Sequence, residues 1–109
     1  MTKEFLEQIR QIANKKIIYT QHALDEMNAE EEIITPEEVR KVVLEGEIIE
    51  DYPEDKRGHS CLILGYSESG RPIHVVCATK ADYLGIITAY VPALNKWTAD
   101  FKVRKEIKK

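Results

Sequence analysis

The stretch ITPEEVRKVVLEGEIIEDY, residues 34–52, contains the change from helical to strand-like periodicity that decides the fold. Thr35 and Glu38 form a predicted capping box, and Pro36 occupies the first helical position, so a helix should begin there. Gly46 should end this helix as its C′ residue. A stripe of apolar residues at helical spacing gives the helix an inward face, formed by Val39, Val42 and Val43. The sequence therefore predicts a helix over residues 36–45.

Two more helices are predicted upstream, over residues 3–14 and 20–29. The first has apolar residues at helical spacing, namely Phe5, Leu6, Ile9, Ile12 and Ala13. Thr20 is the predicted N-cap of the second helix. We interpret Ile17-Ile18-Tyr19, which lies between them, as a short connector.

The second half of the chain has the pattern of a β-sheet. Short β-prone runs separated by turn residues predict strands over residues 47–51, 61–66, 73–79 and 84–91. Because the connections between them are too short for parallel crossovers, we expect an antiparallel meander. The predicted fold is a single α+β domain, residues 1–109, with two to three N-terminal helices on one face of a four-stranded antiparallel sheet.

Composition places the chain among ordinary globular proteins. It has 109 residues, of which 43% are hydrophobic and 32% charged, which suits one core. No apolar run reaches the roughly 18–20 residues that span a bilayer, and the first residues lack the pattern of a signal peptide, so a cytoplasmic location is expected. Cys61 and Cys77 are interpreted as core residues. Three histidines without acidic residues at ligand spacing predict no metal, and we expect no cofactor.

Charge is unevenly distributed along the chain. The net charge is −3, which argues against non-specific coating of nucleic acid. Residues 25–54 contain twelve acidic and two basic side chains, whereas residues 96–109 contain six basic and two acidic ones. This asymmetry allows a basic rim on an otherwise acidic protein. The alternative interpretation is a solvated face and a frayed tail.

Strand register predicts which polar residues share a sheet face. A hairpin around Ser69-Gly70 would pair Leu64 with His74, and a second hairpin would set Thr88 opposite His74. The resulting mixed face would hold Tyr66, His74, Thr88 and Tyr90. The opposite face would be apolar and would pack on the helices through Cys61, Ile63, Gly65, Ile73, Val75, Cys77, Gly85, Ile87, Ala89 and Val91.

The histidines and the tryptophan each have a structural and a functional interpretation. His22, at the second position of a helix, feels the positive end of the helix dipole, which favours a neutral imidazole able to act as a base. It could equally be a partly buried, hydrogen-bonded residue. His74 is either a site residue or a satisfied core histidine, and His59 is interpreted as a surface residue. Trp97 is expected to fold back over the end of the sheet, with base stacking as the alternative.

Five pieces of the chain, taken in order, resemble one protein family. They are Tyr19-Thr20-Gln21-His22-Ala23 with Met27; Ile34–Val39; Gly46–Ile49 with Tyr52-Pro53; Gly70–Val76; and Thr88–Pro92 with Trp97. The set covers roughly residues 17–104 and resembles a family of small prokaryotic proteins catalogued as domain of unknown function 4258.

The resemblance implies a fold like that of the RelE-type ribonuclease toxins, in which one sheet face cleaves RNA without metal. It also implies a toxin–antitoxin role with a small zinc-finger protein as partner. The family's motif residues fall on His22, His74, Thr88 and Tyr90. This chain departs from the pattern, because relatives tend to carry Arg near the methionine where Glu26 and Glu30-Glu31-Glu32 stand here.

Two functional hypotheses follow. The first is a metal-independent endoribonuclease of a toxin–antitoxin module, with RNA as substrate. His22 and His74 would be base and acid, Thr88 and Tyr90 would position the phosphate, and further substrate contacts would come from Arg71, Arg57 and Tyr66. The second is a catalytically inactive member that binds a protein partner, such as a basic antitoxin, through its acidic helices or its mixed face. Neither membrane association nor DNA binding of its own is expected.

Overall fold

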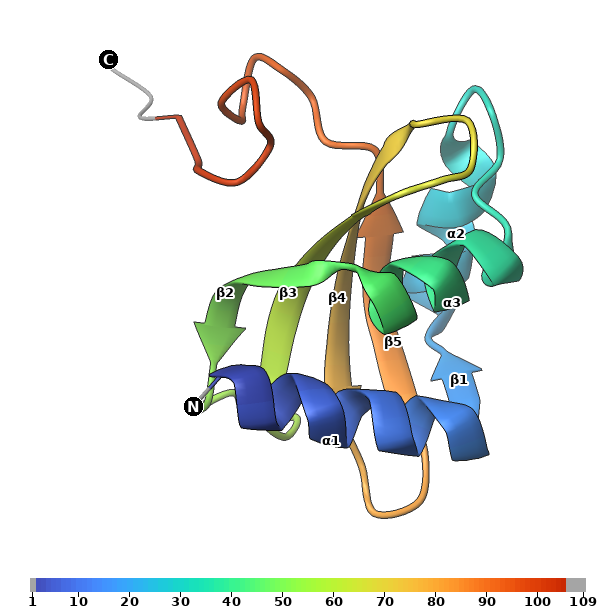
Figure 1. The fold of residues 1–109 in the computed structure, drawn as a ribbon. Helices are drawn as coiled ribbons and strands as arrows, with labels where there is room; N and C mark the ends of the chain where they lie inside the picture. Colours follow the sequence, from blue (N-terminus) through green and yellow to red (C-terminus); the bar gives the residue numbers. More distant parts are fainter. Residues whose placement is uncertain (1, 106–109) are drawn as a thin grey trace.

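Residues 2–105 of the computed structural model form a sheet with helices against one face (Figure 1). The helices are α1 (Thr2–Lys15), α2 (Gln21–Ala29) and α3 (Pro36–Glu45). The strands are β1 (Ile17–Tyr19), β2 (Glu47–Tyr52), β3 (Ser60–Tyr66), β4 (Pro72–Thr79) and β5 (Leu84–Tyr90). They lie in the order β1-β5-β4-β3-β2. Helices α1 and α3 cross one face of the sheet, and α2 lies along β5.

The α+β class with three helices is confirmed, but the prediction of four antiparallel strands is wrong. The residues interpreted as a connector, Ile17–Tyr19, form a fifth strand that pairs in parallel with residues 84–86 of β5. The sheet is therefore mixed. The limit on short crossovers applies only to strands consecutive in sequence, whereas β1 and β5 are separated by two helices and three strands.

The predicted helix starts are confirmed in atomic detail. The Thr20 hydroxyl accepts a hydrogen bond from the Ala23 amide at 3.0 Å, and both halves of the Thr35–Glu38 capping box are formed. Gly46 does end α3, but in extended rather than left-handed conformation. A glycine is needed here because the end of α3 lies very close to β3: a Cβ at position 46 would lie 2.4 Å from the carbonyl oxygen of Leu64.

The first hairpin has the predicted register, with Leu64 opposite His74. The predicted register of the second hairpin is wrong, because a β-bulge in β5 places Tyr90, not Thr88, opposite His74. The bulge also changes which residues face the helices. Leu84 and Ile86 join the core there, in place of the predicted Gly85 and Ile87.

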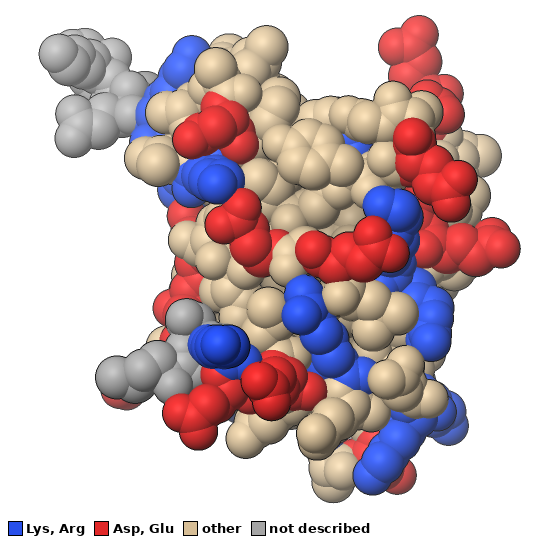
Figure 2. Space-filling model, in the orientation of Figure 1, with Lys and Arg blue, Asp and Glu red and all other residues tan. Residues whose placement is uncertain are grey.

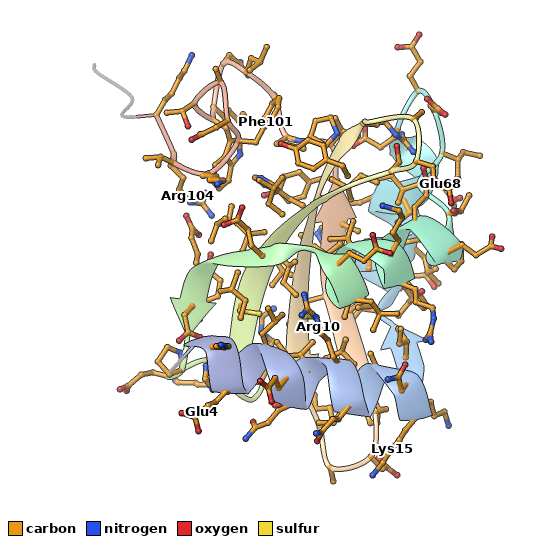
Figure 3. All side chains as sticks on the ribbon, in the orientation of Figure 1. Glu4, Arg10, Lys15, Glu68, Phe101 and Arg104 are labelled. Carbon is orange, nitrogen blue, oxygen red and sulfur yellow. The ribbon has the colours of Figure 1, made fainter. Side chains whose placement is uncertain are left out.

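The helices cover one face of the sheet, and residues 92–105 cover part of the other. The main core lies between the helices and the sheet. Arg10 links α1 to the end of α3 by donating hydrogen bonds to the carbonyls of Val43 and Gly46 (Figure 3). On the other face the chain after β5, residues 92–105, runs across the sheet toward β2, where Arg104 pairs with Glu50. A second group of buried side chains lies outside the helix-side core: Leu62, Leu64, His74 and Trp97.

Nothing in residues 2–105 forms a helix of the length and apolar character needed to cross a membrane.

Candidate functional site

A pocket of about 510 Å³ opens between α2, the end of β5 and residues 92–105. Its lining combines polar and apolar groups: Glu26, Tyr90, Val91, Ala93, Lys96, Trp97, Arg104 and Lys105. Three of these side chains are cationic and one is anionic, so the pocket is basic although the protein carries a net charge of −3. Figure 3 labels Arg104 and Phe101 on the segment that forms its outer wall.

His74 supports this pocket from within the protein. Its imidazole is fully buried, and Nε2 lies 2.8 Å from the carbonyl oxygen of Phe101. Because a carbonyl only accepts, Nε2 must carry the proton, and Nδ1 is left to accept a hydrogen bond from the Tyr90 hydroxyl at 3.2 Å. The edge of the ring also contacts Trp97, with centroids 4.4 Å apart. His74 therefore has the satisfied, buried environment that the structural interpretation expected.

Burial sets the protonation of this pair. Desolvation lowers the pKa of His74, which keeps the imidazole neutral, and the Phe101 carbonyl only partly offsets it. Desolvation likewise raises the pKa of Tyr90 to about 12. The phenol is thus a proton donor at neutral pH, and it is the Tyr90 side chain, not His74, that lines the pocket.

His22 does not line the pocket but contacts Glu26, which does. Nε2 of His22 lies 3.3 Å from Oε1 of Glu26, which also accepts hydrogen bonds from the Thr88 hydroxyl at 2.7 Å and the Ala89 amide at 3.3 Å. The His22 side chain is 66% exposed, whereas that of Glu26 is 31% exposed. A carboxylate at Nε2 favours the tautomer with a proton there, which leaves Nδ1 as the basic nitrogen.

Of the predicted site residues, Tyr90 lines the pocket, whereas His22, Thr88 and His74 do not line it but belong to two hydrogen-bonded sets that end on its lining residues Glu26 and Tyr90. One set runs from His22 through Glu26 to Thr88, and the other joins His74 to Tyr90. The prediction that His74, Thr88 and Tyr90 share a sheet face is met in spite of the shifted register, because the bulge precedes Thr88.

The other predicted residues lie elsewhere. Arg71 is 14% exposed and is held by Glu38 at 3.0 Å and by the carbonyls of residues 32 and 33. Arg57 binds Asp55, whose pKa it holds well below the usual range. Tyr66 is exposed at the end of β3. None of these three lines the pocket.

The cations that do line the pocket come from the tail that the frayed-tail interpretation left unstructured. Trp97 folds back as predicted and is 3% exposed. Arg104 stacks over its ring, 4.7 Å from the centroid, and pairs with Glu50 at 2.8 Å. The excess of basic residues after position 95 was the available sequence signal, but the ion-pair partners Glu47 and Glu50 lie in β2 and cannot be identified from spacing.

Residues 19–91 match a family model described as "Domain of unknown function (DUF4258)". The match spans α2, α3 and strands β2 to β5, begins at the last residue of β1, and ends before the segment that supplies the pocket's cations. No curated protein and no solved structure matches the chain.

Proposed function

Since this chain belongs to the DUF4258 family, whose description names no activity, its function has to be inferred from the residues at its pocket, and we propose that it is a metal-independent endoribonuclease acting beside Glu26 and Tyr90. We also propose that the protein is similar to the RelE-type toxins in fold and in role.

The basic lining of the pocket is the observation that supports RNA as substrate. Lys96, Arg104 and Lys105 converge on a space that also exposes the Tyr90 phenol, which suits a phosphodiester and the extra charge of its transition state. The pocket offers one carboxylate, and residues 2–105 contain no cluster of His, Cys, Asp or Glu able to hold a metal ion. In this proposal, side-chain cations balance the phosphate charge.

The two hydrogen-bonded sets supply a base and an acid. Nδ1 of His22 accepts the proton of the ribose 2′-hydroxyl, while Glu26, held by Thr88, orients the ring and stabilises the imidazolium that forms. Tyr90 donates its proton to the leaving oxygen, for which its hydroxyl rotates so that the O–H points away from Nδ1 of His74. His74 is a positioning residue that fixes the Tyr90 hydroxyl and does not touch the substrate.

The reaction is a transfer within the RNA. A bond forms between the 2′-oxygen and phosphorus as the bond from phosphorus to the 5′-oxygen breaks. One strand then ends in a 2′,3′-cyclic phosphate and the other in a 5′-hydroxyl. One proton moves from the 2′-hydroxyl to His22 and one from Tyr90 to the leaving oxygen, and a proton passing back from His22 to Tyr90 through solvent restores the enzyme.

Cleavage of a labelled single-stranded RNA in the presence of chelator tests this proposal. His22→Gln should slow cleavage by about 100-fold or more, the usual effect of losing a general base. The matched control is His59→Gln, because His59 also lies beside a carboxylate, 2.6 Å from Asp51, but belongs to neither of the two hydrogen-bonded sets at the pocket. Intact RNA with the wild-type protein, or equal rates for the two variants, would contradict the proposal.

A second candidate function, binding of a protein partner without catalysis, is favoured by a different surface. The end of α2 and the loop to α3 carry Glu30, Glu31 and Glu32 beside Ile33, which is 55% exposed. Figure 2 shows acidic side chains gathered over this corner of the molecule. A basic antitoxin would suit this surface. If the protein binds such a partner and leaves RNA intact, the binding function is favoured.

A further inference from the structure

We propose that a second pocket, at the opposite end of β5, binds a base of the same single-stranded RNA; the inference rests on the proposed function and names a recognition subsite for it. This second pocket has a volume of about 280 Å³. Its walls include Ile18, Tyr83, Gly85 and Ile87, with Lys80 and Arg57 among the lining side chains. The volume is near the lower end of small-molecule sites and suits one flat ring system.

Both pockets open on the same face of the sheet. Ile86 and Cys77 face the helices, so their neighbours Gly85 and Ala78 face the other side, which is also the side of Tyr90 and His74. Ile87 lines the second pocket and Tyr90 the first. Three residues along a strand span about 10 Å, so one extended RNA segment running along β5 could occupy both pockets.

The chemistry of the second pocket fits a nucleotide. Ile18 is 40% exposed and Ile87 is half-exposed, which gives apolar surfaces for the face of a base. The Tyr83 ring adds an aromatic surface of the kind on which bases stack. Lys80 donates to the backbone carbonyl of Arg57, which places an ammonium group beside the pocket to meet the phosphate backbone.

Gly85 leaves space for the ligand. A Cβ at this position would lie 3.7 Å from the Ala78 carbonyl oxygen and 3.8 Å from the Tyr83 ring, which are ordinary contacts. A side chain there would therefore extend into the pocket without a backbone clash. Gly65, on the helix face, is the opposite case, because its Cβ would lie 2.9 Å from the Cα of Val42. Gly85→Val thus fills the pocket and also adds a residue that favours strands.

Titration of the full chain with adenosine 3′-monophosphate, followed by backbone amide NMR, tests the inference. We expect shifts at Gly85 and Ile87 with the nucleotide, no such shifts with ribose 5-phosphate, and affinity at least about tenfold weaker in Gly85→Val, a loss of about 1.4 kcal/mol. Ile18→Glu, which changes an exposed edge residue and places a carboxylate beside the pocket, should also weaken binding. Absence of shifts at Gly85 and Ile87, or equal affinity in a folded Gly85→Val, would overturn it.

Cleavage assays on the same variants separate this inference from the proposed function. If wild-type protein cuts RNA and Gly85→Val cuts it equally well while no nucleotide binds near Gly85, the subsite is wrong and the ribonuclease proposal stands. If the nucleotide binds at Gly85 and RNA stays intact, the subsite stands and the ribonuclease proposal fails.

Discussion

At the scale of single residues, His74 shows how one buried imidazole organises a surface. Both ring nitrogens are used, one toward the Phe101 carbonyl and one toward the Tyr90 hydroxyl, and Trp97 packs on its edge. Phe101 adopts a left-handed conformation, with φ of 63°, which is costly for a non-glycine residue. His74 contacts both the Phe101 carbonyl and the Trp97 ring, and these contacts help to hold the C-terminal segment in place.

The stability of the protein should therefore depend on pH through His74. Burial lowers the pKa of the folded imidazole below its ordinary value of about 6.5, so the unfolded chain binds the extra proton first as the pH falls. The free energy of unfolding should decrease from about pH 7 to pH 5, by at most about 1.4 kcal/mol per pH unit from this group.

Urea denaturation of the wild type and of His74→Asn across that range measures the effect. The variant should be less stable at pH 7, because the Tyr90 and Phe101 partners are disturbed, but its stability should fall less as the pH drops. Glu38 and Glu50 have lowered pKa values and lose their contributions only in more acidic solution. Parallel pH profiles for the two proteins would contradict this account.

At the scale of elements, the edge of β5 explains the positions of Glu26 in α2 and Glu30 directly after it. Strand β1 pairs only with residues 84–86, which leaves the rest of that edge without a neighbouring strand. Oε1 of Glu26 accepts from the Ala89 amide at 3.3 Å, and Oε2 of Glu30 accepts from the Val91 amide at 3.0 Å. These two carboxylates thus replace a strand partner, which gives both glutamates a structural role.

Hydrogen exchange can test the role of Glu30 directly. Glu30→Ala should raise the exchange rate of the Val91 amide and lower the free energy of unfolding by about 0.5–1.5 kcal/mol, the usual contribution of one hydrogen bond. Glu31→Ala is the matched control, since Glu31 is exposed one position further along. Unchanged protection of Val91 in Glu30→Ala would contradict the assignment.

At the scale of the whole molecule, the elements with local signals were predictable. The Thr35 capping box and the turn at Ser69-Gly70 depend on residues a few positions apart. The start of α3 and the register of the first hairpin were therefore both predicted correctly. Strand β1 was missed because it has three residues and its partners at 84–86 lie far along the chain. The β5 bulge and the pocket's cations depend on tertiary packing, which periodicity does not report.

Charge distribution over the whole molecule leads to a prediction about salt. If the three cations of the pocket contact phosphates, the logarithm of the RNA association constant should fall with the logarithm of salt concentration with a slope of about −2. Replacing Lys96 and Lys105 by Ala should bring the slope to about −0.7, which fluorescence anisotropy can measure. A slope near zero in the wild type would show that the basic pocket does not bind the RNA backbone.

The most direct measurement is the mass of the cleavage product from a DNA oligonucleotide that contains one ribonucleotide, incubated with the protein and a chelator. We expect a single cut after that ribonucleotide and a fragment ending in a 2′,3′-cyclic phosphate, with no cut in all-DNA substrate. An intact chimeric strand, or a fragment ending in a 3′-hydroxyl, would contradict this expectation.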